Sequence, residues 1–378
     1  MGLLAREMSR ESNGRWQRFN SPDWSFIIAA LLGALFLCAV LRPAWSPGSF
    51  VHTAGPGSDG QFNYRLALYP FTHQPLDYGI QFDHPAARQQ RIIYPLVSWL
   101  AAFGSPIFVP ALLIFVNYFA LCLMGWLGGT IAQTLKRHAL WGVLLPLYPG
   151  CLIALSCDSV EILELCLLLA SLVALRRQCH VCATLLLTLA LLTKETALLA
   201  VIAAACVYGA ARQRGREPSV KWFYFTVPLA VFVLWQALLF YIWRTLAVAH
   251  DRREIGLPFV GFIRLLVKAL RGQTPMPTGT LIELLLIAGF ALLVLVQLRT
   301  TVASLFERAA WVLFAVWAFA LNSNVWNTDW NFWRALAEVY LLGALIIIGG
   351  RRAHRFVLGA SIIGLWFWQA YRLIVYLT

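Results

Sequence analysis

Long apolar runs, separated by short polar stretches, dominate the pattern of hydrophobic and polar positions along this chain. A transmembrane helix needs about 20 consecutive, mostly apolar residues, and the pattern predicts about eleven spans. We place these spans at 24–42, 107–131, 139–155, 158–175, 180–193, 196–211, 221–243, 280–298, 302–321, 331–349 and 355–376. The predicted fold is an all-α polytopic membrane protein that forms a single domain over residues 1–378.

One apolar run is too short to span a bilayer comfortably. It extends from Ile92 to Phe103 and ends at Gly104-Ser105-Pro106. We interpret this run as an interfacial or partly re-entrant helix within the first loop, residues 43–106. A short true span is the alternative.

The composition supports the same fold class. The chain of 378 residues is 60% hydrophobic and 12% charged, whereas a soluble domain has about 25% charged residues. The net charge of +13 would suggest nucleic acid as a partner of a soluble protein. Here most basic residues lie in short loops between apolar runs, which is typical of cytoplasmic loops. We therefore expect no nucleic acid and expect membrane lipids around the chain.

The distribution of Lys and Arg predicts the orientation. The segment 1–23 contains four arginines and is expected to stay in the cytoplasm. Alternation from there places five basic loops on the same side, provided that the run at Ile92 does not cross. These loops contain Lys136-Arg137, Arg176-Arg177, Arg212 to Lys221, Arg299 and Arg351 to Arg355.

The loop 244–279 disagrees with this charge rule, because it is predicted to lie outside and is also basic. Arg264, Lys268 and Arg271 follow one another at i, i+4, i+7 spacing, with Phe262, Ile263, Leu266 and Val267 between them. This pattern predicts an amphipathic helix on a membrane surface. Its basic face would suit anionic lipid or a lipid-linked phosphate.

The polar segments that remain are predicted to gather on the outer side, so we expect any chemistry there. One of them is the turn Gly55-Pro56-Gly57-Ser58-Asp59-Gly60, which is followed by a short predicted helix from Gln61 to Leu68. Asp59 precedes this helix, where a carboxylate caps backbone amides for about 1 kcal/mol. A cap and a catalytic base are compatible roles, since the cap fixes the direction of the carboxylate.

Lys194-Glu195 interrupts an otherwise apolar run from Val181 to Val207. An ionised side chain at the bilayer centre costs about 2.5–3.5 kcal/mol, so two short spans joined at Thr193-Lys194-Glu195-Thr196 are expected to place the pair at the outer interface. One interpretation is a tight hairpin with a local ion pair. The other is that Lys194 binds a phosphate and that Glu195 orients either this phosphate or the acceptor.

Three further groups are predicted on the same side. Asp158 and Glu161 lie at the first turn of a span, where acidic groups suit the helix dipole. The segment from Asn322 to Asn331, which includes Asp329, alternates amides with tryptophans. Such a segment is either an aromatic belt or a sugar-binding surface. Arg334 follows just inside the next span and needs a partner, for which a bound phosphate is a candidate.

Cysteine and histidine give weaker indications of a site. Cys179-His180-Val181-Cys182 resembles a metal or redox pair, yet no second pair accompanies it. His52, His73 and His84, with Asp77 and Asp83, match no compact set of metal ligands. We expect no dedicated cofactor, and a divalent metal stays an open alternative.

Taken in order, these residues resemble a known family. The order is one span, an outer loop with Asp-Gly-Gln-Phe-x-x-Arg-x-Ala from Asp59, then Gln90-Arg91-Ile92-Ile93-Tyr94-Pro95-Leu96, and then many spans with Thr193-Lys194-Glu195-Thr196 between two of them. This resembles the GT-C superfamily of polyprenyl-phosphate-dependent glycosyltransferases. It is most similar to the bacterial multi-span proteins related to the second mannosyltransferase of GPI-anchor synthesis. The resemblance is strongest over residues 55–105.

The resemblance implies a GT-C-like bundle and an inverting transfer of a sugar from a polyprenyl-phosphate donor to an extracytoplasmic glycan, lipid or protein. It implies Asp59 as the catalytic base. Relatives often carry two acidic residues in this loop, and this chain has Ser58 and Gly60 beside Asp59, which disfavours a two-carboxylate metal site. The substrate-binding residues that we assign are Gln61, Arg65, Arg91, Tyr94, Asp158, Lys194, Glu195, Asp329 and Arg334.

The implied mechanism needs few groups. A general base deprotonates the acceptor hydroxyl, and cationic groups stabilise the departing lipid phosphate. The candidates for the phosphate are Arg65, Arg91, Lys194 and Arg334. The expected location is the bacterial cytoplasmic membrane, with the site facing outward. A non-catalytic subunit of a glycan assembly complex and a lipid or glycan transporter are the alternatives.

Overall fold

The computed structural model describes residues 20–41, 59–247 and 254–377. Within these ranges the chain is mostly helical, and the sheet described is a two-stranded antiparallel hairpin. The predicted turn at Gly55–Ser58 and the charged residues Asp251, Arg252 and Arg253 lie outside the described residues. The fold class predicted from the apolar runs is confirmed as all-α.

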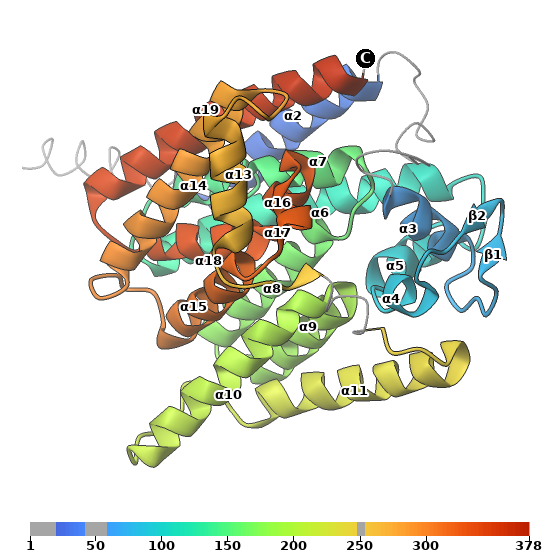
Figure 1. Ribbon diagram of the computed structural model, residues 1–378. Coiled ribbons are helices and arrows are strands. Elements are labelled where there is room, and N and C mark those ends of the chain that lie inside the picture. Colours follow the sequence, from blue (N-terminus) through green and yellow to red (C-terminus); the bar gives the residue numbers. More distant parts are fainter. Residues whose placement is uncertain (1–19, 42–58, 248–253, 378) are drawn as a thin grey trace, which may run out of the picture.

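The apolar helices form one bundle (Figure 1). They are α2 (Pro22–Leu41), α6 (Val109–Thr134), α7 (Pro149–Ser156), α8 (Glu161–Arg176), α9 (His180–Thr193), α10 (Leu198–Gln213), α11 (Phe223–Trp243), α14 (Pro277–Gln297), α15 (Leu305–Phe319), α18 (Ala337–Ile348) and α19 (Arg352–Leu377). Short 3₁₀ turns at Ala139–Leu144 and Glu195–Ala197 precede α7 and α10.

Among the residues that the structure describes, six helical segments are long and apolar enough to cross a membrane. They are α2, α6, the segment Glu195–Gln213 that contains α10, α11, α14 and α19. The other predicted spans are also helices, but α8 has 16 residues, α9 has 14 and α18 has 12. The chain is therefore a polytopic membrane protein, and the number of eleven spans stays a prediction.

Burial separates the core of the bundle from its lipid-facing helices. Every residue of α18 is buried. In the most apolar stretch of α6, 56% of the residues are buried. By contrast, only 17% and 22% of the residues are buried in the corresponding stretches of α11 and α14. A helix that is apolar on all sides yet largely uncovered by protein is suited to lipid contact. α18 lies at the centre and α11 and α14 lie at the periphery.

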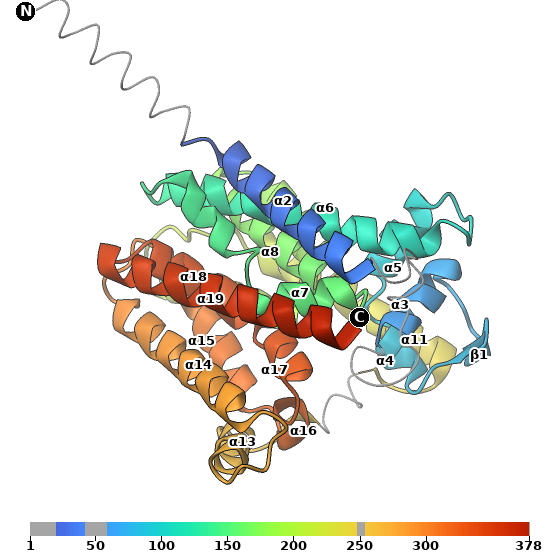
Figure 2. The same ribbon diagram turned by 90° about the horizontal axis from the view of Figure 1, so that it is seen from above.

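Helices α3 (Asp59–Leu68), α4 (Pro85–Gln89) and α5 (Ile93–Ala101), with the hairpin, lie together at one end of the bundle (Figures 1 and 2). α5 has nine residues and is about 14 Å long, too short to cross about 30 Å of hydrocarbon. The sequence did not predict the hairpin β1 (Leu76–Asp77) and β2 (Ile80–Gln81). Its two turn residues, Tyr78 and Gly79, both have positive φ, as a tight hairpin turn requires.

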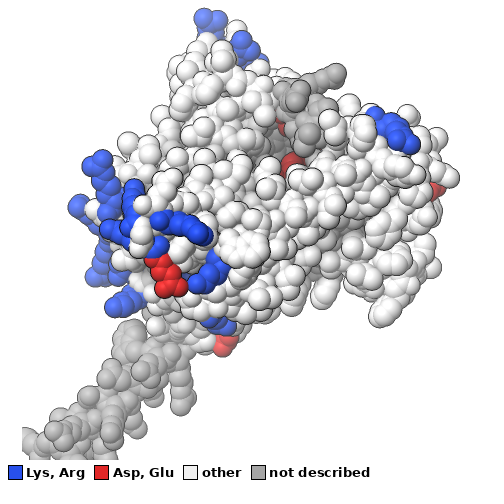
Figure 3. Space-filling model, turned by 90° about the horizontal axis from the view of Figure 1, so that it is seen from below, with Lys and Arg blue, Asp and Glu red and all other residues white. Residues whose placement is uncertain are grey.

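The opposite end of the bundle is basic. Arg176, at the end of α8, donates to Glu307 at 2.6 Å, and Arg137 donates to the carbonyl of Gly350 at 3.3 Å. Arg176 also donates to Thr134, the last residue of α6, at 3.2 Å. These contacts show that the loops after α6, α8 and α18 lie together, about 24 Å from the other end of α8. On the face shown in Figure 3, most Lys and Arg side chains gather at one end and the broad middle is almost uncharged.

Candidate functional site

Asp59 is the first residue of α3, at the end of the bundle away from the basic loops. Arg88 Nη1 lies 2.8 Å from its Oδ1, and Arg334 Nη2 lies 3.0 Å from its Oδ2. The Asp59 side chain is still 30% exposed. We predicted a helix cap here, but α3 begins at Asp59 itself, so the carboxylate lies in the first turn. The partners described for it are arginines, which makes Asp59 part of a charged site.

Arg88 is fixed on several sides. It lies on α4, which begins at Pro85, where proline suits the first helical position. Its Nε and Nη2 donate to the two carboxylate oxygens of Asp83 at 2.8 and 2.7 Å. Its guanidinium also lies 4.2 Å from the centre of the Phe62 ring. Arg88 thus bridges Asp83 and Asp59.

Arg334 connects the outer segment to the core. It comes from α17 (Asp329–Ala335), and only 9% of its side chain is exposed. Its Nε donates to Oε1 of Glu161 at 3.0 Å. Glu161 is the first residue of α8 and is buried, a position where a carboxylate also suits the helix dipole. We call Asp59, Arg88, Glu161 and Arg334 the Asp59 cluster.

The local ion pair predicted between Lys194 and Glu195 is wrong. Arg91 donates to both oxygens of Glu195, at 2.9 Å from Nε and 2.5 Å from Nη2. Lys194 Nζ instead lies 2.9 Å from Oε1 of Glu338, to which Thr196 also donates. The reason is that Lys194 has an extended backbone, in which successive side chains point in opposite directions.

A small polar cleft brings the Asp59 cluster next to Arg91. Its volume is about 10 Å³, so it has room for about one water molecule. The cleft is lined by Asp59, Phe62, Asn63, Arg88, Arg91, Ser159, Val160 and Arg334. The charged groups fill the cleft themselves, so a ligand larger than a water molecule enters only after some of them move apart.

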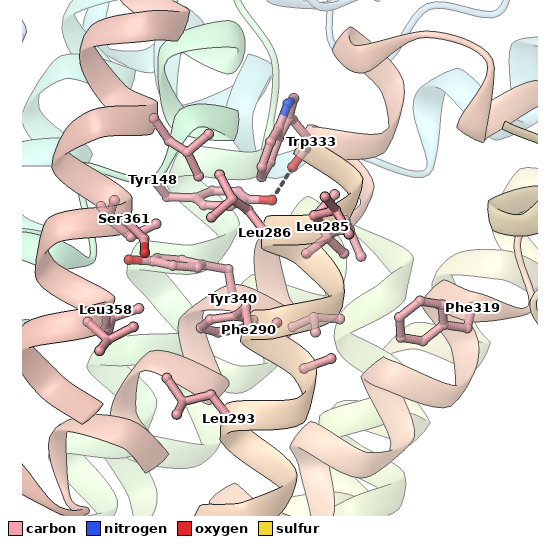
Figure 4. Close-up of a pocket in the computed structure, with 18 residues that line it drawn as sticks. Tyr148, Leu285, Leu286, Phe290, Leu293, Phe319, Trp333, Tyr340, Leu358 and Ser361 are labelled. Atoms are coloured by element: carbon pink, nitrogen blue, oxygen red, sulfur yellow. Dashed lines mark hydrogen bonds between the residues drawn. The ribbon is translucent and has the colours of Figure 1, made fainter. Parts of the chain in front are cut away.

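An apolar cavity begins one residue away from Arg334. Its volume is about 210 Å³, and it lies among α7, α14, α18 and α19 (Figure 4). Trp333 lines it, and Tyr148 donates to the carbonyl oxygen of Trp333 at 2.6 Å. Two adjacent residues of α17 therefore line different spaces. Trp333 lines the apolar cavity and Arg334 lines the polar cleft.

A second cavity continues this space along α14 and α19. It has about 650 Å³ and shares Leu286, Ser361 and Leu365 with the first. α14 is one of the helices least covered by protein. The two cavities together form what we call the α14–α19 groove, an apolar groove between a peripheral helix and the bundle.

The structure places Arg65 and Tyr94 outside the cleft. Arg65 is 1% exposed and donates to the carbonyls of Gln74, Pro75 and Ile80. It therefore holds the hairpin loop against α3, which leaves it unsuited to a phosphate. Tyr94 is fully buried and donates to the carbonyl of Leu113 at 2.9 Å. Both predicted substrate contacts are better explained as structural.

The other predicted site residues are placed less directly. Gln61 lies half-buried on α3, two residues from Asp59. Asp158 is fully buried, has a φ of +48°, and its carboxylate has no hydrogen-bond partner within the described part of the chain. The side chain of Asp329 lies outside the described residues. Asp158 adjoins the cleft through its neighbour Ser159, which lines it.

Three charged residues of this region were missing from the predicted site. They are Arg88, Glu161 and Glu338. Glu161 and Glu338 each lie in the first turn of an apolar helix, and an acidic residue there needs a partner because it enters a low-dielectric region. Arg88 follows Asp83 by five positions, a spacing with no distinctive pattern. The two glutamates were predictable as paired residues, and Arg88 was not.

The charges around Asp59 determine its protonation. Burial by itself would raise the pKa of Asp59, but the nearby charges of Arg334, Arg88 and Arg91 outweigh burial and hold the pKa well below its usual value of 3.8. The carboxylate is therefore ionised at neutral pH. It acts as the counter-ion of the arginines and is a weak base in this state.

No set of metal ligands stands out. Among residues 20–41, 59–247 and 254–377, no three His, Cys, Asp or Glu residues are placed to hold a metal ion. His52 lies outside these ranges, while His73 and His84 are within them. No residue is assigned to a metal here.

Comparisons with known proteins leave the site as the basis for function. No family model, curated protein or solved structure matches this chain. The site contains arginines that are neutralised by the protein's own carboxylates, with a partly exposed aspartate at its mouth and an apolar groove beside it. These features suit a ligand with a negative head and an apolar chain.

Proposed function

We propose that this protein is a membrane glycosyltransferase of the GT-C type. It would move a sugar from a polyprenyl-phosphate donor to an extracytoplasmic acceptor, with inversion and with Asp59 as general base. One observation supports this most directly. Asp59 is partly exposed and paired with Arg88 and Arg334, and the α14–α19 groove begins at Trp333, next to Arg334.

The arginines suit the phosphate of the donor. An arginine fork binds phosphate oxygens with two parallel hydrogen bonds, as it binds a carboxylate. Arg88 and Arg334 already bind Asp59 through single nitrogens at 2.8 and 3.0 Å. A phosphate would compete with Asp59 for them. We expect Arg88 to move first, because its other partner, Asp83, is 43% exposed, whereas Arg334 is held by buried Glu161.

This exchange would also activate the base. While the arginines face Asp59, its pKa is too low for efficient proton abstraction. When they turn to the phosphate, the pKa of Asp59 rises towards the range in which a base accepts a proton. The acceptor hydroxyl then passes its proton to Asp59 as its oxygen bonds to the anomeric carbon. The bond from that carbon to the phosphate oxygen breaks, and the lipid phosphate leaves as an anion without a general acid.

The α14–α19 groove suits the apolar part of the donor. Its two cavities share lining residues and run beside a lipid-facing helix. An isoprenoid chain would lose contact with water or lipid and gain contact with the groove's apolar walls. The phosphate would then lie near Arg334 and the sugar near Asp59. Arg91, which also lines the cleft, is a further phosphate ligand once it leaves Glu195.

The test is a transfer assay with purified protein in lipid nanodiscs. It uses a small panel of polyprenyl-phosphate sugars and lipid, glycan and peptide acceptors, each with and without chelator. The proposal expects transfer from at least one donor, with inversion at the anomeric carbon. Transport of a lipid-linked sugar across a bilayer without any bond formation would contradict it and favour the transporter. The isolated protein would show neither transfer nor transport if it is a non-catalytic subunit. Transfer would occur only when other subunits are added, and it would persist in the Asp59→Asn variant.

A further inference from the structure

Helix α13 (Val260–Leu270) runs across the direction of its neighbours. In Figure 1 it stands crosswise to α14 and α19, and in Figure 2 it is seen nearly end-on while α14, α18 and α19 lie lengthwise. α14 and α19 are candidates for membrane spans. A helix that crosses the direction of spanning helices is inclined away from the membrane normal, which suits an interfacial helix.

α13 lies at the same end of the bundle as the Asp59 cluster. Lys268 Nζ donates to Asn327 at 3.0 Å, and Phe262 stacks edge-on against Trp326 at 5.3 Å. Trp326 ends α16 (Ser323–Trp326), which leads directly into α17 and Arg334. The contacts of α13 with α16 place it beside the Asp59 cluster whatever reaction the cluster carries out.

The segment before α13 fixes its orientation. The backbone amides of Gly256 and Phe259 donate to the carbonyls of Ala320 and Phe319 at 2.7 and 2.6 Å. Gly261 approaches α16 so closely that a Cβ there would lie 2.4 Å from the ring of Trp326. α13 is thus attached by backbone contacts, and the direction of each of its faces is set by the protein.

The side chains of α13 divide into three faces, as the helical period of 3.6 residues allows. One face packs on the protein and is buried: Gly261, Leu265 and Ala269. The second is apolar but exposed: Ile263 is 52%, Val267 38% and Leu270 66% exposed. The third carries the exposed basic side chains of Arg264, Lys268 and Arg271.

The exposed apolar and basic faces indicate different surroundings. Ile263, Val267 and Leu270 form one exposed apolar row along the helix, which suits insertion among lipid chains better than contact with water. The basic face lies next to them around the helix. A row of three cations beside an immersed apolar face is complementary to anionic headgroups.

We propose that α13 is a binding site for anionic phospholipids of the surrounding bilayer. Its apolar face is immersed among the upper acyl chains, and Arg264, Lys268 and Arg271 bind the phosphate groups. Each basic residue near an anionic surface raises affinity about fivefold. The site lies at the membrane surface beside the candidate active site and is separate from it.

The test uses the full chain in nanodiscs that contain a photoreactive phosphatidylglycerol or a photoreactive phosphatidylcholine with the same acyl chains. Labelled peptides that cover 254–276 are then quantified. We expect the anionic probe to label this segment about tenfold more than the zwitterionic probe. The triple variant Arg264→Gln, Lys268→Gln, Arg271→Gln should lose this preference while the apolar face is still labelled. The matched control, Arg212→Gln, Arg214→Gln, Arg216→Gln at the end of α10, should retain it.

Three results would overturn the proposal. The first is equal labelling by both probes in the unaltered protein. The second is an absence of labelling by either probe. The third is loss of the anionic preference on addition of 10 mM inorganic phosphate, about the concentration that competes at a millimolar site, which would indicate a site for soluble anions. Thermal unfolding of each variant shows whether a loss of the anionic preference is caused by misfolding. If the triple variant is misfolded, the labelling is repeated with the single variant Arg264→Gln.

Discussion

Arg334 Nη2 donates to Oδ2 of Asp59 at 3.0 Å, across 275 positions of the sequence. The same guanidinium donates through Nε to Glu161. Because an arginine fork presents its donors in fixed directions, this single side chain aligns the first turns of α3 and α8. The contact joins the outer segment to the membrane bundle at the place where the cleft lies.

The first prediction concerns this contact. Arg334→Gln should lower the free energy of unfolding by roughly 3–5 kcal/mol, because it leaves buried Glu161 without its cationic partner. The free energy of unfolding of Arg334→Lys should lie between that of Arg334→Gln and that of the unaltered protein, since one ammonium cannot hold both carboxylates in the same geometry. Unfolding in mixed detergent, followed by tryptophan fluorescence, measures both. Equal stability of all three proteins would mean that the contact is absent in the membrane.

The second prediction concerns Lys194 and Glu338, whose side chains are 6% and 0% exposed. Lys194→Met should destabilise the protein by roughly 3–5 kcal/mol, because it leaves a buried carboxylate unpaired. Adding Glu338→Gln removes that charge and keeps an acceptor for Thr196, so the double variant should recover most of the loss. A double-mutant cycle from unfolding curves gives the coupling energy. Additive losses would contradict the pairing.

The third prediction follows from the depressed pKa of Asp59. A carboxyl whose pKa is lower in the folded than in the unfolded state contributes stability above its unfolded pKa and loses it as pH falls through the folded pKa. The difference in Tm between the protein and Asp59→Asn should therefore be constant from about pH 8 to pH 5 and should shrink below about pH 4. Glu217→Gln is the control, because Glu217 is 85% exposed. A difference that grows on acidification would have the wrong sign.

The apolar pattern predicted the position of almost every long helix, because each helix in lipid satisfies its own backbone hydrogen bonds. The charge pattern predicted that the loops with Arg137 and Arg176 share one end, which the hydrogen bond from Arg176 to Thr134, three residues before Arg137, bears out. The hairpin at Tyr78-Gly79 was missed, since its strands have two residues each and leave no alternation to detect.

The composition of the site could be predicted only in part. Asp59, Arg334 and Arg91 stood out as charged residues near apolar runs, and the structure brings them to one cleft. Their partners could not be assigned, because pairings such as Arg91 with Glu195 join residues 104 positions apart. Adjacent charges suggested a local pair at Lys194-Glu195, and the extended backbone there separates them. Arg65 looked free, and the unpredicted hairpin supplies its partners.

The fourth prediction tests the close packing of α13. Gly261→Ala should destabilise the protein by about 1–3 kcal/mol, because the new Cβ would meet Trp326 at 2.4 Å and the carbonyl of Leu321 at 2.7 Å. Gly289→Ala, in the middle of α14, is the matched control. A Cβ at Gly289 meets nothing within 4 Å, so this change should be neutral or stabilising by up to about 1 kcal/mol. A neutral Gly261→Ala, read from the same unfolding curves, would place α13 further from α16.

The proposed reaction depends on the carboxylate of Asp59, and one comparison tests it most directly. Asp59→Asn and Asp83→Asn each remove one carboxylate partner of Arg88, but Asp59 alone lines the cleft. In the nanodisc transfer assay, with thermal unfolding confirming that both variants fold, Asp59→Asn should reduce the rate by about 10²–10⁴-fold. The transfer rate of Asp83→Asn should stay within about tenfold of that of the unaltered protein, because this substitution loosens Arg88 without removing the base. Transfer by folded Asp59→Asn at a rate equal to that of Asp83→Asn would contradict the assignment of Asp59 as the base.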